Sequence, residues 1–171
     1  RKLAIDLGAE APFLRPIELA EPGISLDHVL QHCFLWLAEH EKYHPDVVIP
    51  LEISHPLRPS GLLEQVVGVL IEENLDTVFT VYEERHSFWE IGDYGELQRI
   101  GNQEGQPRGT RPPLFREMAG LAMACQPNQI SQGQRFGDKI GVVPLREPYA
   151  LVDTQDSLGL ALAKHLLDTD W

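Results

Sequence analysis

The sequence has no apolar run long enough to span a bilayer, and its first residues lack the hydrophobic core and cleavage site of a signal peptide. Both absences predict a cytoplasmic protein. Cysteine is scarce as well, with only Cys33 and Cys125, far apart and each within an apolar stretch. This spacing excludes a disulfide framework or a zinc knuckle and predicts two buried free thiols.

Basic residues are also few, with 14 Lys and Arg against 26 Asp and Glu, and the formal net charge is -12. Such a chain repels phosphate backbones and anionic lipid surfaces, which excludes nucleic acid and membranes as partners. A small anionic ligand remains compatible with this charge, because a few arginines in a cleft can outweigh the average field locally.

The 171 residues, 43% of them hydrophobic, suit a single domain spanning 1–171. Apolar periodicity and turn residues predict its elements. In chain order they are a helix ending at Gly8, a short strand at 9–13, a helix at 26–39 capped by Ser25, a strand at 47–51, a helix at 61–73, strands at 77–81 and 140–145, and a helix after Thr154. The apolar stretch 114–125 fits either a strand or a strand leading into a helix.

Two strands, 47–51 and 77–81, are apolar without alternation, which is typical of strands buried on both faces of a parallel sheet. With the helix at 61–73 between them, they form a βαβ unit. The segment 83–113 is rich in glycine and proline and predicts a hairpin-like excursion outside the main sheet. The fold class expected is therefore α/β.

Four segments occur in an order that resembles one known family. They are Gly8–Pro16 followed by Glu-Leu-Ala, the stretch Leu51–Arg58, the stretch Arg108–Arg116, and Val152–Thr154. Together these motifs resemble the acylneuraminate cytidylyltransferase family over essentially the whole chain. The family's Ala-Arg-Gly-Gly-Ser-Lys nucleotide loop has no counterpart, so the resemblance implies a fragment that lacks the first βαβ unit.

The resemblance implies a Rossmann-like nucleotidyltransferase fold, a three-layer sandwich with a mostly parallel sheet. The implied reaction transfers CMP from CTP to an acidic, nonulosonic (sialic-acid-like) sugar and releases pyrophosphate. Mg²⁺ is the implied cofactor, and a homodimer joined through the 83–113 excursion is the implied assembly.

The resemblance also implies the site residues. Asp153 would be catalytic and bind Mg²⁺, and Arg58 would be catalytic by contacting the acidic sugar or a phosphate. The implied substrate-binding residues are Glu52, Ser54, His55, Arg108, Phe115 and Arg116. The residues themselves also allow a structural reading of this region, in which Thr154 caps the last helix and Asp156 favours its dipole.

Several positions depart from the family pattern. Leu151 stands where the family usually has a second aspartate, Glu52 replaces glutamine, Met118 replaces asparagine, and His55 replaces serine. A leucine cannot bind a hard cation, and an ionised Glu52 can only accept hydrogen bonds. These departures leave two readings open: an enzyme for a different acidic sugar, or a non-catalytic relative that serves as a binding or interaction module.

Histidines recur in the helix at 26–39 and just beyond it. His28 and His32 are four residues apart, with His40 and His44 following, which is a spacing that transition metals use. No carboxylate or cysteine completes a ligand set, and the positions lie opposite the apolar face, so we expect solvated side chains. No serine stands in a Gly-x-Ser-x-Gly frame, which argues against a hydrolase elbow.

Overall fold

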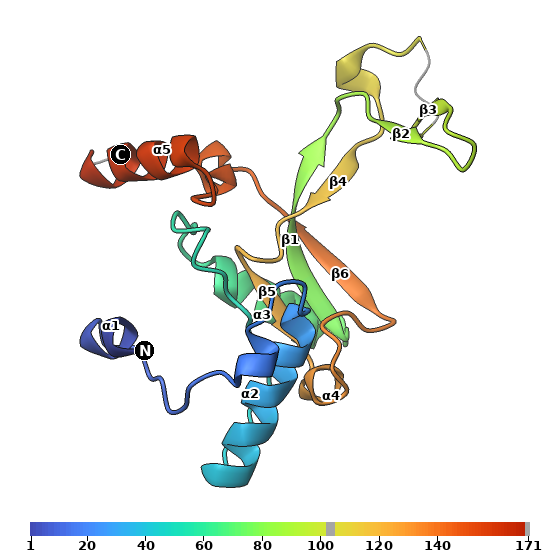
Figure 1. Ribbon diagram of the computed structural model, residues 1–171. Coiled ribbons are helices and arrows are strands. Elements are labelled where there is room, and N and C mark those ends of the chain that lie inside the picture. Colours follow the sequence, from blue (N-terminus) through green and yellow to red (C-terminus); the bar gives the residue numbers. More distant parts are fainter. Residues whose placement is uncertain (102–104, 170–171) are drawn as a thin grey trace.

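The computed structural model describes residues 1–101 and 105–169, and Figure 1 shows their arrangement. The helices are α1 (Lys2–Asp6), α2 (Leu26–His40), α3 (Leu62–Glu72), α4 (Pro127–Ser131) and α5 (Ser157–Asp168). The strands are β1 (Thr77–Glu84), β2 (Trp89–Ile91), β3 (Leu97–Arg99), β4 (Leu114–Glu117), β5 (Met123–Cys125) and β6 (Ile140–Pro144). Three short 3-10 turns are η1 (Ile17–Leu19), η2 (Arg108–Thr110) and η3 (Pro148–Leu151).

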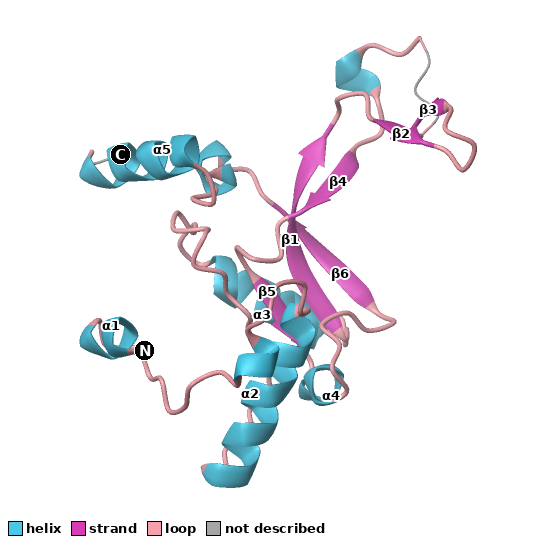
Figure 2. Cartoon of the chain, viewed as in Figure 1, coloured by secondary structure: helices cyan, strands magenta, loops and turns pink. Residues whose placement is uncertain are grey.

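The main sheet is organised around β1, as the strands of Figure 2 show. One edge of β1 pairs in parallel with β6, from Thr77 opposite Ile140 onward. Its other edge pairs antiparallel with β5 along its first half and with β4 along its second half. The expected α/β class is therefore present, built on a mixed sheet.

The mostly parallel sheet expected from the apolar strands is not confirmed. In the described residues, the 47–51 segment makes a single antiparallel bridge, from Val48 to Cys125, and β5 separates it from β1. The chain turns back between β1 and β4, and β4 and β5 then run in the same direction along one edge of β1, so that β5 occupies this position. An apolar strand buried on both faces has the same composition whichever direction its neighbours run, so the sequence pattern could not reveal the reversal.

Helices cover both faces of the sheet. On one face, Val66 and Leu70 of α3 are fully buried against Val78 of β1 and Val143 of β6. On the other face, residues of α2 and α4 pack on the next residues along the strands, including Phe79, Met123 and Cys125. Successive strand residues point to opposite faces, and this alternation produces three layers.

Near the N-terminus, two helix predictions are confirmed and one strand prediction is wrong. The helix ending at Gly8 is present as α1, and Gly8 has φ of +88°, as expected for a residue that follows a helix. Ser25 caps α2 by accepting a hydrogen bond from the amide of Asp27. The strand predicted at 9–13 is wrong, because this segment is irregular and bonds to the Arg1 side chain through the carbonyls of Ala11 and Pro12.

The last helix, α5, begins at a different cap residue from the one considered in the sequence, and only a small part of it is buried. Asp156, not Thr154, is the cap, and its Oδ1 accepts the amide of Gly159 at 2.7 Å. Ala163 is buried and Leu166 packs beside it, whereas Leu158 is 77% exposed. Ala161 and Leu162 of the same helix are also exposed.

The excursion after β1 contains the expected hairpin. Strands β2 and β3 pair antiparallel, with Trp89 opposite Arg99, and the hairpin extends away from the rest of the molecule in Figure 1. Residues 102–104 of the excursion lie outside the described residues. None of the described helices is both long and apolar enough to cross a membrane.

Candidate functional site

Two loops that are a hundred residues apart in sequence meet beside the sheet. The backbone amide of Thr154 donates to the carbonyl of Ser54 at 2.9 Å, and the Thr154 hydroxyl donates to the same oxygen at 3.2 Å. Leu57 and Val152 are buried together against Ala163 of α5. The 51–58 loop and the 152–154 loop are therefore held as one unit.

A larger pocket lies where these loops face the start of α2. It encloses about 730 Å³. Its lining residues are Arg15, Leu26, Leu51, Glu52, Ile53, Ser54, Thr154 and Gln155. This volume falls in the range that small-molecule sites occupy.

A smaller pocket of about 320 Å³ lies against the turn between β4 and β5. Its lining residues are Glu52, His55, Arg116, Glu117, Met118, Ala119, Gly120, Leu151 and Asp153. Glu52 lines both pockets, which makes them neighbours. Five of the eight predicted site residues are thus brought together, namely Glu52, Ser54, His55, Arg116 and Asp153.

Asp153 follows η3 and precedes the cap of α5. Its Oδ1 accepts the amide of Gln155 at 2.9 Å, which fixes the carboxylate over the first residues of this turn. The first turn of α5 approaches the Asp153 backbone so closely that a Cβ at Gly159 would lie 1.7 Å from the Asp153 carbonyl oxygen. Glycine at this position is what allows the helix to start here.

Ser54 and His55 form a polar pair at the boundary of the two pockets. The Ser54 Oγ and the His55 Nδ1 lie 3.1 Å apart, and the tautomer of the imidazole decides which group donates. Ser54 lines the larger pocket and His55 the smaller one. A hydroxyl and an imidazole are therefore available to a ligand that crosses between the pockets.

Arg116 and Phe115 are neighbours on β4 with different surroundings. The Arg116 guanidinium lies over the Tyr82 ring, 5.5 Å from its centroid, and its Nε is 3.6 Å from Glu84. Phe115 is half exposed and does not line either pocket. Adjacent strand residues point to opposite faces, so Arg116 and Phe115 cannot share one pocket wall.

The predicted Arg58 and Arg108 also lie outside the linings of both pockets. The Nε of Arg58 donates to the carbonyl of Leu121 at 2.5 Å, and burial lowers the pKa of its guanidinium. Arg108 is in η2, within the 83–113 excursion that precedes β4 in the chain. Direct contact of either arginine with substrate stays a prediction.

The lining residues that the sequence reasoning had not selected include Arg15, Glu117 and Gly120. Arg15 makes no side-chain hydrogen bond or ion pair within residues 1–101 and 105–169. It belongs to the 8–16 segment that carries the family resemblance, and this was a signal that could have identified it. Nothing in the sequence marks Gly120, whose role depends on the fold.

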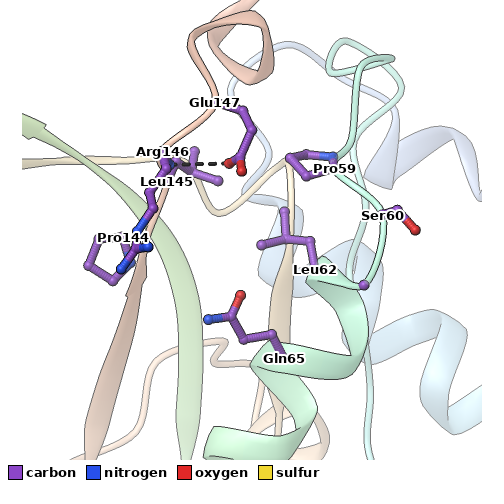
Figure 3. A pocket seen from close by; sticks show the side chains of 9 residues that line it. Pro59, Ser60, Leu62, Gln65, Pro144, Leu145, Arg146 and Glu147 are labelled. Atoms are coloured by element: carbon purple, nitrogen blue, oxygen red, sulfur yellow. Dashed lines mark hydrogen bonds between the residues drawn. The ribbon is translucent and has the colours of Figure 1, made fainter.

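A third pocket of about 400 Å³ lies at the start of α3, and Figure 3 shows it from close by. Ser60, Gln65, Arg146 and Glu147 contribute its polar side chains, and the Arg146 amide donates to Glu147 Oε2 at 3.2 Å. None of its lining residues belongs to the predicted site. We therefore treat the Glu52 pockets as the candidate site.

Two histidines of α2 contact aromatic side chains. The His32 ring meets Phe13 edge-on at 5.2 Å between ring centroids, and His40 stacks on Trp36 at 4.5 Å. Throughout the part of the chain that the structure describes, no group of three or more potential ligands is close enough to hold a metal ion. His32 and His40 therefore lie against aromatic rings.

Comparison with known proteins supports the fold. No protein-family model matches the chain, and no curated protein matches it. A solved structure does match, with a TM-score of 0.57 and 13% sequence identity over 87% of this chain and 67% of the other. It is 4-diphosphocytidyl-2C-methyl-D-erythritol synthase from Anaerococcus prevotii. The likeness shows a shared fold. At this identity it shows nothing about the reaction or the substrate.

Proposed function

We propose that this chain transfers CMP from CTP to an acidic, nonulosonic sugar and releases pyrophosphate. The observation that carries the proposal is the convergence of Glu52, Ser54, His55, Arg116 and Asp153 on two adjoining pockets. The shared fold supports the same class of chemistry, because the matching structure is named for the synthesis of a diphosphocytidyl compound. The acidic sugar rests on the family resemblance alone.

The two pockets differ in size and charge, and this suggests how the substrates divide. The larger pocket has room for a nucleotide and carries Arg15, a cation without a protein partner among the described residues. Guanidinium groups pair readily with phosphate oxygens, so we assign CTP to this pocket. The smaller pocket, with His55, Arg116 and Asp153, then receives the sugar.

Mg²⁺ is the cofactor in this proposal, and Asp153 is the residue that would hold it. Asp153 Oδ1 is bonded to the Gln155 amide, which leaves Oδ2 for a cation. A hard carboxylate oxygen on a pocket wall fits Mg²⁺, which takes its other ligands from water and substrate phosphates. When bound, the ion would neutralise phosphate charge during transfer.

The remaining side chains would orient the sugar. Ser54 and His55 offer a hydroxyl and an imidazole that can exchange hydrogen bonds with sugar hydroxyls. Arg116 is only loosely paired, at 3.6 Å from Glu84, so its guanidinium is available for a sugar carboxylate. These contacts bind and position the acceptor next to the nucleotide.

The proposed assembly is a homodimer formed through the β2–β3 hairpin. Large apolar side chains are exposed along this hairpin, including Trp89, Ile91, Tyr94 and Leu97. Clusters of exposed apolar side chains are typical of protein interfaces. Size-exclusion chromatography with light scattering tests this, and a monomer at all concentrations would contradict it.

A binding or interaction module is the second candidate function. Leu151 and Met118 both line the smaller pocket, at positions where the resembled family has an aspartate and an asparagine. Two apolar side chains in place of polar ones weaken a site for metal and sugar. This observation favours a protein that keeps the fold and binds a ligand without catalysis.

The test is pyrophosphate release from CTP in the presence of Mg²⁺ and a panel of acidic nine-carbon sugars. We expect release by the unaltered chain and a loss of at least about 100-fold in Asp153→Asn, a size typical for removal of a group that stabilises transition-state charge. Asp168→Asn, an exposed aspartate of α5, is the matched control and should retain activity. Binding of CTP without release for any sugar would favour the module.

A further inference from the structure

Among the residues that line the two site pockets, Glu52 is the one that belongs to both. It lines both of them, and its backbone amide donates to the carbonyl of Gly120 at 2.9 Å. The hydrogen bond ties the 51–58 loop to the turn between β4 and β5. Glu52 therefore stands at the boundary where two ligands bound in the two pockets would meet.

Gly120 determines where the Glu52 carboxyl group lies. A Cβ built on Gly120 would be 2.7 Å from the Glu52 Cδ and 3.0 Å from each of its carboxyl oxygens. The missing side chain of Gly120 leaves the space that the carboxyl group occupies. Because Gly120 lines the smaller pocket, this contact places the carboxyl group at the wall of that pocket.

The Glu52 side chain has no partner of its own. Its carboxyl oxygens take part in no hydrogen bond or ion pair within the described ranges, 1–101 and 105–169, although the residue is half buried. A carboxylate that lies on a pocket wall without a protein partner is available to a bound ligand, because small-molecule sites use a few placed polar groups to orient their ligand. A ligand in the smaller pocket is the natural partner.

We propose that Glu52 determines acceptor specificity by accepting hydrogen bonds from an amino or hydroxyl group of the acceptor, with Gly120 as its positioning residue. An ionised carboxylate has no proton to donate and repels a second carboxylate. Of the groups that a sugar carries, an ammonium group gains most from it, since a charge-assisted hydrogen bond is about twice as strong as a neutral one.

This inference rests on the proposed function and makes its substrate more specific. An acidic sugar would turn its carboxylate away from Glu52, and Arg116 and His55 in the same pocket are the groups that suit it. Its amino or hydroxyl face would meet Glu52. The acceptor class is therefore a sugar with a hydrogen-bond donor opposite its acidic group, and an amino sugar fits best.

The experiment measures binding, so that it does not depend on catalysis. Dissociation constants for glucosamine, glucose and 2-deoxyglucose are determined by ligand-observed NMR at pH 7 on the full chain. These sugars differ only in carrying an ammonium group, a hydroxyl group or hydrogen at one carbon. We expect affinity to fall in that order, with glucosamine binding roughly ten-fold tighter than 2-deoxyglucose, as one charge-assisted hydrogen bond would give.

Two variants separate the charge of Glu52 from its position. Glu52→Gln keeps the shape and removes the charge, and Gly120→Ala keeps the charge and displaces the flexible carboxyl group. Both should reduce the preference for glucosamine to about two-fold or less, whereas Glu72→Gln on the exposed side of α3 should leave it unchanged.

Equal affinities for the three sugars, an unchanged preference in Glu52→Gln, or no measurable binding of any of them would overturn the inference. A preference that depends on Glu52, found in a chain that releases no pyrophosphate, would support the inference and reject the proposed enzyme. Pyrophosphate release by a chain with no such preference would support the enzyme and overturn the role of Glu52. The two proposals can therefore fail separately.

Discussion

Thr154 donates two hydrogen bonds to one oxygen, the carbonyl of Ser54, from its amide at 2.9 Å and from its hydroxyl at 3.2 Å. These bonds connect residues that are a hundred positions apart, and they fix the loop with Glu52 and Ser54 relative to the loop with Asp153. The geometry of both pockets depends on this connection.

Removing the Thr154 hydroxyl tests this connection. Thr154→Val keeps the volume and loses the 3.2 Å hydrogen bond, so we expect the free energy of unfolding to fall by about 1 kcal/mol. Ligand affinity in the candidate site should fall as well. Thr154→Ser keeps the hydroxyl and serves as the control in denaturant titrations. Equal stability of the valine and serine variants would contradict the role of this hydrogen bond.

Arg58 should matter more for stability than for substrate binding. Its Nε donates to the carbonyl of Leu121, a fully buried residue, and lysine cannot reproduce this planar geometry. We expect Arg58→Lys to lower the free energy of unfolding by about 1–3 kcal/mol, the range for a buried acceptor left unsatisfied.

The matched control for Arg58 is Arg146→Lys, which alters an exposed side chain with no side-chain hydrogen bond in the described residues. Chemical denaturation and substrate titration of both variants give the comparison. A large rise in KM for Arg58→Lys with an unchanged free energy of unfolding would instead indicate that Arg58 contacts the substrate.

Thr80 holds the turn that forms the floor of the smaller pocket. It is fully buried in β1, and its hydroxyl donates toward the carbonyls of Met118 at 2.6 Å and Ala122 at 3.2 Å. We expect Thr80→Val to lower the free energy of unfolding by about 1 kcal/mol, because the buried hydroxyl hydrogen bond is lost while both carbonyls keep a backbone amide donor.

An exposed threonine provides the comparison for Thr80. Thr110→Val in η2 removes a hydroxyl that water can replace, so its effect should stay within about 0.5 kcal/mol. Thermal and urea unfolding measure both changes. Similar small effects for the two variants would show that the Thr80 hydroxyl is not needed to hold the turn.

Cys125 makes stability depend on alkaline pH. Burial raises the pKa of its thiol from 9.0 to about 12, with nearby Arg135 lowering it and Asp27 raising it to lesser extents. The unfolded chain releases this proton near pH 9 while the folded chain keeps it. Stability contributed by the neutral thiol is therefore complete below pH 9 and is lost as pH rises toward 12.

Substitution of each cysteine checks this pH dependence. Between pH 9 and pH 12, the Cys125 thiol should lower the free energy of unfolding by up to about 1.4 kcal/mol per pH unit. In Cys125→Ala the free energy of unfolding should fall less steeply over the same pH range. Cys33→Ala is the control, since Cys33 is only half buried. Iodoacetamide at pH 8 should label Cys33 first and Cys125 only on unfolding. Fast labelling of Cys125 in the native chain would contradict its burial.

Much of the local structure followed from the sequence. The caps and apolar spacing defined α1 and α2, and the apolar runs defined β1 and β6, because these signals act over a few residues. Motif order also selected five residues that the structure places on two adjoining pockets.

Other features were decided by contacts between distant segments. One is the antiparallel direction of β5, which lies beside Val48. Another is the hydrogen bond from Arg58 to the Leu121 carbonyl, and a third is the burial of Ala163 in place of Leu158 in α5. Each depends on the segment that packs against it. The sequence determined which residues favour helices, strands and polar loops, because those preferences are local. Only the tertiary structure decided strand direction, the partner of each buried polar group and the contact between Glu52 and Gly120, because these depend on segments that meet only after folding.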